Sequence, residues 1–160
     1  RSFFIGLGQL YIVFSMILFL SFIISEPPLG GILFFIVFVV SVALSDIGGY
    51  FGGRLIGGKK VLERISPNKT WAGVIVGWVL VGIFYYFIFF IGVFQSHYYF
   101  FLFWGVALSS QLGDFIESYA KRYFGVKDSS NIIPGHGGAL DRFDGLICSV
   151  YFVKAVDFFI

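Results

Sequence analysis

Long apolar runs make up most of the chain, and the polar residues gather in the segments between them. A helix needs about 20 mostly apolar residues to cross the hydrocarbon core of a bilayer. Five stretches approach this length, at residues 3–25, 29–45, 73–94, 98–113 and 145–160. The last is short and contains Lys154 and Asp157, so it is the weakest of the five. The pattern predicts an all-α, polytopic transmembrane protein with about five spans.

Composition supports lipid as the main solvent of this surface. The 160 residues are 58% hydrophobic, 22% aromatic and 12% charged, whereas soluble domains carry about 25% charged residues. A small soluble core could not hide all 23 Phe, because a domain of this size leaves much of its surface wet. The net charge of +2 is too small to imply nucleic acid, and no basic run with interleaved aromatics is present, so we expect no nucleic-acid partner.

Two of the connections between predicted spans are long, at residues 46–72 and 114–144. An even number of crossings separates them, so they share one side of the membrane. They contain five and four of the 11 Lys and Arg residues, and positively charged loops stay in the cytoplasm. They also hold seven of the nine Asp and Glu residues, which the positive-inside rule does not explain. Bound metal and phosphate would require both signs of charge at one place.

Acidic and basic residues alternate at the start of the second long connection. If this segment is helical, four side chains fall on one face: Asp114, Glu117, Ser118 and Lys121. Carboxylates near the end of a span are expensive to bury and are often functional. The alternatives are a buried ion pair with Lys121 or Arg122, or a water-exposed helix end.

The second connection continues into a turn rich in Gly and then into two further carboxylates. Pro134 and three glycines allow the backbone to approach a ligand, and backbone N–H groups in such turns bind anions. Asp141 and Asp144 are one helical turn apart, and with Asp114 they could form an oxygen site suited to Mg²⁺. Four cations are available to neutralise phosphates: Lys121, Arg122, Lys127 and Arg142.

The first long connection is rich in Gly and basic residues. Six glycines lie between residues 48 and 58, with Arg54 and two lysines beside them. They either approach a nucleotide or allow close helix packing beside a basic membrane-surface patch. Ser66 before Pro67 predicts a helix start, which would be an anion site, and Lys69 would add a point charge for phosphate.

Both connections resemble the phosphatidate cytidylyltransferases, also called CDP-diacylglycerol synthases. The first carries Asp46 to Lys59 and Ser66-Pro-Asn-Lys-Thr-Trp, but Ala72 stands where the family is usually acidic. The second carries Gln111-x-Gly113-Asp114-x2-Glu117-Ser118-x2-Lys121-Arg122-x4-Lys127-Asp128-x5-Pro134-Gly135-His136-Gly137-Gly138-x2-Asp141-Arg142-x-Asp144. Family members have more N-terminal helices, so we expect residues 1–160 to be one transmembrane catalytic domain, the C-terminal part of a longer protein.

This resemblance implies the reaction of CTP with phosphatidic acid to give CDP-diacylglycerol and pyrophosphate at the cytoplasmic face of a bacterial inner membrane. It implies CTP, phosphatidic acid and the bilayer as partners, a homodimer as one assembly open to the chain, and Mg²⁺ as cofactor with room for a second cation. The expected metal ligands are Asp114, Asp141 and Asp144, and the expected catalytic residues are Asp114, Asp141, Lys121 and Arg142. The expected substrate-binding residues are Asp46, Arg54, Ser66, Asn68, Lys69, Thr70, Glu117, Ser118, Arg122, Lys127, Asp128, His136, Gly137 and Gly138.

Two alternatives from other functional classes remain open on sequence alone. An ion-coupled transporter would use Asp114 and Glu117 to bind a cation, but its carboxylates should lie near the middle of the membrane. A related lipid or polyprenol kinase, or an archaeal-type lipid cytidylyltransferase, would change the acceptor and keep the architecture.

Overall fold

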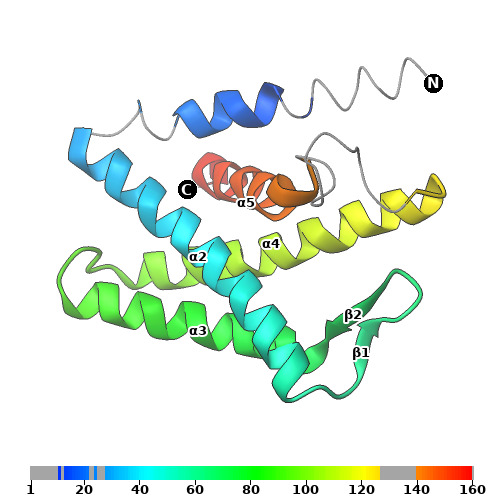
Figure 1. The fold of residues 1–160 in the computed structure, drawn as a ribbon. Coiled ribbons are helices and arrows are strands. Elements are labelled where there is room, and N and C mark those ends of the chain that lie inside the picture. The colour runs from blue at the N-terminus through cyan, green and yellow to red at the C-terminus, as the bar shows by residue number, and fades with distance from the viewer. Residues whose placement is uncertain (1–10, 12, 22–23, 25–27, 127–139, 160) are drawn as a thin grey trace.

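The computed structural model describes residues 11, 13–21, 24, 28–126 and 140–159 of the chain. Residues 13–21 are helical, and four long helices and one short hairpin follow (Figure 1). In chain order these are α2 (Pro28–Leu55), β1 (Lys60–Leu62), β2 (Ser66–Thr70), α3 (Trp71–Phe90), α4 (His97–Tyr123) and α5 (Leu140–Phe159).

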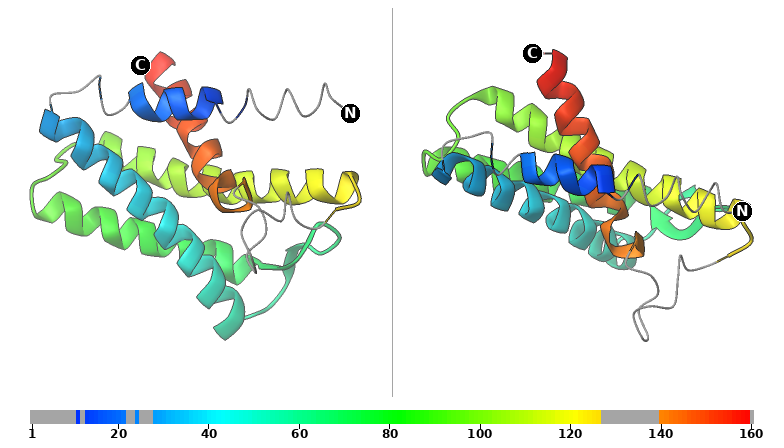
Figure 2. Two further views of the ribbon diagram at one scale, coloured as in Figure 1. Left: turned by 45° about the horizontal axis from the view of Figure 1, so that its top comes forward. Right: turned by 90° about the horizontal axis from the view of Figure 1, so that it is seen from above.

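The long helices pack around one apolar core. Helix α2 packs mainly against α3, and α4 mainly against α5, as the views in Figure 2 also show. The core contains side chains from all four helices, among them the fully buried Phe38, Val81, Phe103 and Val150. Figure 1 places the hairpin and the C-terminal end of α4 at one end of the bundle, and the α3–α4 connection at the opposite end.

The apolar runs predicted the positions of the helices well. Each of the last four predicted stretches coincides with a long helix, whereas much of the first lies outside the described residues. Among the described residues, two helices are long and apolar enough to cross a membrane, Gly31–Leu55 and Trp71–Phe90. Large apolar side chains also point outward from the bundle, such as Phe90 at 79% exposure. An outer surface of this kind suits contact with lipid.

The structure is mostly helical, as the all-α prediction requires, and adds one short hairpin that the sequence pattern did not indicate. Strands β1 and β2 pair antiparallel, with Lys60 opposite Thr70 and Leu62 opposite Ser66. The predicted helix start at Ser66 and Pro67 is wrong, because both residues belong to β2. A two-stranded hairpin has free edges, so Pro67 fits without removing a needed hydrogen bond.

Helix α3 begins at Trp71 and is capped by Thr70. The backbone of Thr70 is extended, and its Oγ1 accepts a 3.2 Å hydrogen bond from the Gly73 amide. Such caps satisfy one of the N–H groups that a helix start leaves without a partner. Strand β2 thus passes directly into α3.

The cap leads to a prediction on stability. Thr70→Ala should lower the free energy of unfolding by about 1 kcal/mol, because the Gly73 amide loses its acceptor. Thr70→Ser keeps the hydroxyl and should unfold close to wild type. Thermal unfolding without substrate measures both variants, and equal melting of the Ala and Ser variants would contradict the capping role.

The Gly-rich segment belongs to helix α2 as far as Leu55, so Asp46 and the glycines from Gly48 to Gly53 are helical, whereas Gly57 and Gly58 follow the helix with positive φ. The glycines allow α2 and α3 to touch along their backbones. A Cβ added to Gly48 would lie 2.6 Å from the Gly77 Cα, and one added to Gly73 would collide with the Gly49 carbonyl oxygen. Small residues at helix interfaces permit such close approach in membranes. The structure thus shows close helix packing at Gly48 and Gly52, while Gly49 and Gly53 line the pocket described below, so the approach of a nucleotide to these glycines stays a prediction.

Candidate active site

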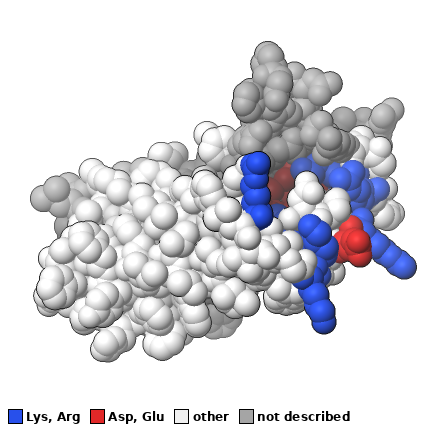
Figure 3. All heavy atoms as spheres, turned by 60° about the horizontal axis from the view of Figure 1, so that its bottom comes forward, with Lys and Arg blue, Asp and Glu red and all other residues white. Residues whose placement is uncertain are grey.

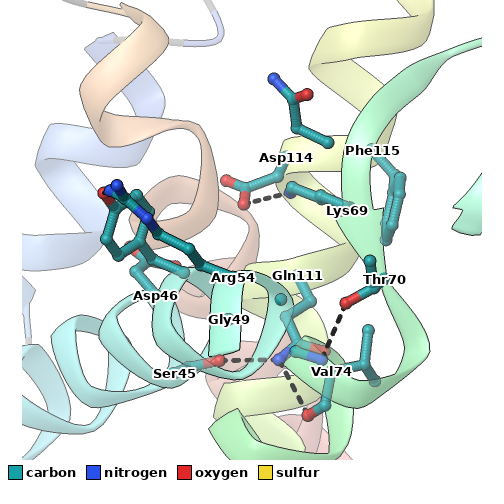
Figure 4. A pocket seen from close by; sticks show the side chains of 14 residues that line it. Ser45, Asp46, Gly49, Arg54, Lys69, Thr70, Val74, Gln111, Asp114 and Phe115 are labelled. Carbon is teal, nitrogen blue, oxygen red and sulfur yellow. Dashed lines mark hydrogen bonds and ion pairs between the residues drawn. The ribbon is translucent and has the colours of Figure 1, made fainter. Parts of the chain in front are cut away.

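A pocket of about 510 Å³ lies between α2, β2, the start of α3, and α4. The pocket lies at the charged end of the bundle. On the face drawn in Figure 3, the Lys, Arg, Asp and Glu side chains gather at that end, and the remaining described surface of this face is uncharged. Figure 4 shows the polar side chains of the pocket converging from these separate elements. Six predicted site residues line it: Asp46, Arg54, Asn68, Lys69, Thr70 and Asp114.

An ion pair between Lys69 and Asp114 crosses the pocket (Figure 4). Lys69 comes from β2 and Asp114 from α4, and 45 residues separate them in the sequence. The Lys69 Nζ also lies 4.6 Å from the centre of the Phe115 ring. Both side chains of the pair are partly exposed, at 30% and 25%, so a ligand in the pocket has access to them.

A second cation lies on the α2 wall of the pocket. Arg54 donates a 2.6 Å hydrogen bond from Nη1 to the hydroxyl of Tyr50, one helical turn earlier. Both residues line the pocket. The pocket therefore presents one guanidinium and one ammonium group, both of which can donate charge-assisted hydrogen bonds to a phosphate.

Gln111 forms the floor of the pocket, and the sequence analysis gave it no role. Its Nε2 donates to Ser45 Oγ at 3.1 Å and to the Val74 carbonyl oxygen at 3.4 Å, so it joins α4 to α2 and α3. The position of this amide near the end of the apolar stretch 98–113 could have indicated the role, because buried polar groups in such helices are usually hydrogen-bonded to a neighbour.

The predicted polar face of α4 is confirmed and meets α5. Asp144 of α5 lies near enough to Asp114 and Glu117 of α4 for these carboxyl groups to influence one another's pKa. Glu117 pairs in turn with Lys121 at 3.3 Å. The two helices come this close because of Gly113, where an added Cβ would lie 2.7 Å from the Asp144 carbonyl oxygen.

Burial makes the charged forms of Asp114 and Asp144 costly. These residues lie one position beyond the apolar stretches 98–113 and 145–160. Desolvation raises the pKa of Asp144 to about 7, and the neighbouring Glu117 raises it too. Desolvation likewise raises the pKa of Asp114 to about 6, although Lys69 acts in the opposite direction. A bound cation would stabilise both carboxylates in their charged forms.

The described donors agree in kind with Mg²⁺, since two neighbouring carboxylates are hard oxygen ligands and this ion retains several waters. Within the described residues, no group of three or more His, Cys, Asp or Glu side chains is placed to hold a metal. The third predicted ligand, Asp141, lies one turn before Asp144 in α5, but its side chain is outside the described part of the structure, as is that of Arg142. The metal site stays a prediction.

The remaining predicted residues fall into two groups. Ser66, Ser118 and Arg122 are described but do not line this pocket, and the same holds for Glu117 and Lys121. The predicted residues of the connection between α4 and α5 lie outside the described residues: Lys127, Asp128, His136, Gly137 and Gly138.

Comparison with known proteins gives consistent matches over most of the chain. The sequence model of the group described as "Cytidylyltransferase family" matches residues 3–159. A phosphatidate cytidylyltransferase of Rickettsia bellii is 42% identical over 151 residues, which cover 89% of this chain and 63% of that protein. Proteins of the same name from Brucella suis and Haemophilus influenzae are each 40% identical, covering 89% and 85% of this chain and 52% and 49% of their own lengths. The chain thus spans between about half and two thirds of these curated relatives.

Proposed function

The chain belongs to the cytidylyltransferase family, and from that premise we propose that it transfers the cytidylyl group of CTP to phosphatidic acid. The products are CDP-diacylglycerol and pyrophosphate. The observation that carries the proposal is the pocket in which Arg54, Lys69 and Asp114 meet from three separate elements. Its volume of about 510 Å³ is within the usual range for small-molecule sites.

In the proposed reaction, an oxygen of the lipid phosphate forms a bond to the α-phosphorus of CTP. The bond from that phosphorus to the bridging β-phosphate oxygen breaks, and pyrophosphate leaves with the electron pair. The lipid phosphate is already ionised near neutral pH, so no general base is required. The main catalytic task is to bring two anions together, which fixed positive charges accomplish.

Residues in and beside the pocket have different roles in this task. Lys69 and Arg54 are placed to bind the phosphates and to lower their mutual repulsion. Asp114 and Asp144 would hold Mg²⁺, with Asp141 as the third candidate, and the ion would supply further stabilisation of the negative charge on the leaving pyrophosphate. Gln111 keeps α2, α3 and α4 in register below the reacting groups.

The proposal places the protein across a bacterial cytoplasmic membrane, with the charged end of the bundle on the cytoplasmic side. The two apolar helices, the bacterial relatives and the Lys and Arg residues near the hairpin support this orientation. Phosphatidic acid would then approach from the lipid and CTP from the cytosol.

Radiolabelled CTP tests the proposed function directly. Purified protein in detergent mixed with phosphatidic acid should move the label into lipid, and removal of Mg²⁺ with a chelator should stop the transfer. Uptake of cations into vesicles, with no label in lipid, would instead support a transporter. Label transfer to a polyprenol or an archaeal-type lipid but not to phosphatidic acid would change the acceptor.

Lys69 provides a sharper prediction within this assay. Lys69→Met removes the charge and keeps the length of the side chain, and should lower kcat/KM for CTP by about 100-fold, or roughly 2.7 kcal/mol. Lys154→Met is the matched control, because Lys154 pairs with Asp157 at 3.5 Å near the end of α5 and does not line the pocket. Equal activity of the two variants would remove Lys69 from the proposed phosphate site.

A further inference from the structure

Ser110 is a buried hydroxyl at the point where α4 crosses α5. Its residue is 0% exposed, and it precedes Asp114 by one helical turn. Both side chains face Gly145 of α5, where an added Cβ would lie 2.6 Å from Ser110 Oγ and 3.3 Å from Asp114 Oδ1. Ser110 therefore lies beside the carboxylates without lining the pocket.

The hydroxyl of Ser110 differs from the other buried serines in its hydrogen bonding. Ser41, Ser109 and Ser149 each donate to the carbonyl oxygen four residues earlier, at 2.7 to 2.8 Å, which is the usual arrangement in an apolar helix. Ser110 Oγ has no hydrogen-bond partner with acceptable geometry among the described residues. A buried hydroxyl without a partner costs free energy, so this position calls for an acceptor.

The acceptor within reach is the carboxylate of Asp46 on α2. Helix α2 brings Asp46 to this part of α4, because the preceding Ser45 is hydrogen-bonded through its side chain to Ala107 and Gln111 of α4. Asp46 also lines the pocket together with Asp114. An ionised carboxylate only accepts hydrogen bonds, and a hydroxyl has one proton to donate, so the two groups are complementary.

We propose that Ser110 is a positioning residue, whose hydroxyl donates a hydrogen bond to the Asp46 carboxylate and holds that carboxylate toward Asp114 in the pocket. This inference rests on the proposed function, because the effect of Ser110 is measured as turnover in the transfer reaction. Ser110 touches no substrate and acts only through Asp46. A residue present merely for its small size, beside Gly145, would be replaced by Ala without loss.

The test compares adjacent serines in the transfer assay. Ser110→Ala should lower kcat at least tenfold and leave KM for CTP within about twofold, because the carboxylate is misplaced while the phosphate-binding cations remain. Ser109→Ala is the matched control, since Ser109 is also buried but donates to Gly105 of its own helix; it should keep wild-type kcat. Ser110→Cys, assayed with reductant, keeps the size with a weaker donor and should fall between Ala and wild type.

A double-mutant cycle separates action through Asp46 from a general packing effect. In the Asp46→Asn background, Ser110→Ala should cause less than a twofold further loss of residual turnover, because its partner is already neutralised. Independent losses that multiply would overturn the proposal, and so would equal kcat for Ser110→Ala and Ser109→Ala. If Ser110→Ala does not insert and fold, Ser110→Cys takes its place, and either wild-type kcat in Ser110→Cys or a loss that multiplies with that of Asp46→Asn overturns the proposal. An inactive wild-type protein would count against the proposed function instead.

Discussion

Asp114→Asn is expected to lower turnover at least 10³-fold, equivalent to about 4 kcal/mol of transition-state stabilisation. Asp114 lines the pocket, pairs with Lys69, and lies within reach of Asp144. Asn has almost the same shape but carries no charge, so it neither orients Lys69 nor serves as a strong ligand for Mg²⁺. The label-transfer assay in mixed micelles measures the loss.

The same variant should not be less stable than the wild-type protein. Burial opposes the charged form of Asp114 and raises its pKa to about 6, so a neutral side chain of the same size removes a cost of folding. Such an exchange of stability for activity is common at functional sites. Thermal unfolding without substrate checks this expectation. Wild-type turnover in Asp114→Asn would contradict the assigned role, and a melting temperature below that of the wild type would contradict the expected stability.

Gly77→Leu is expected to have the largest effect on the fold. A Cβ at this position would lie 2.7 Å from the Ser45 carbonyl oxygen and 2.8 Å from Gln111 Nε2, so any side chain separates α3 from α2 and breaks the floor of the pocket. Forcing atoms into a packed interface typically costs about 1–3 kcal/mol, and a whole Leu side chain against backbone should reach the upper end or exceed it. Transfer activity should be lost because the variant no longer folds.

Gly82→Leu supplies the matched control for this prediction. Gly82 lies on the same helix, and a Cβ added there meets no atom within 4 Å. It therefore experiences the same gain in helix propensity without the collision. Size-exclusion profiles and melting temperatures in detergent compare the two variants. If both melt together, contact between the α2 and α3 backbones does not limit stability.

The sequence predicted the helices where apolar side chains alone decide the outcome. It failed where tertiary contacts override local preference. The apolar stretch 29–45 ends before Asp46, which predicts a connection from that residue onward, yet contact with α3 keeps the segment from Gly48 to Gly53 helical. Ser66 and Pro67 fit a helix start locally, but pairing with β1 makes them a strand.

The candidate site was predictable in its residue types and less so in its geometry. Charges gathered in two connections indicated that Asp46, Lys69 and Asp114 share a site, and the structure brings all three to one pocket. The roles of Gln111 and Ser110 were not predictable, because the polar run from Ser109 to Gln111 does not reveal which helix each side chain faces. Their roles depend on the crossing of α4 with its neighbours, which no local pattern encodes.

The direct passage from β2 into α3 determines how Lys69 is held. Strand β2 ends at Thr70 and α3 begins at the next residue, and the Trp71 amide donates to the Lys59 carbonyl oxygen at 3.1 Å. No residue is left between strand and helix to serve as a hinge, so the Lys69 backbone moves only if α3 moves with it. A cation mounted in this way is preorganised, and it responds to developing negative charge without a reorganisation cost during the reaction.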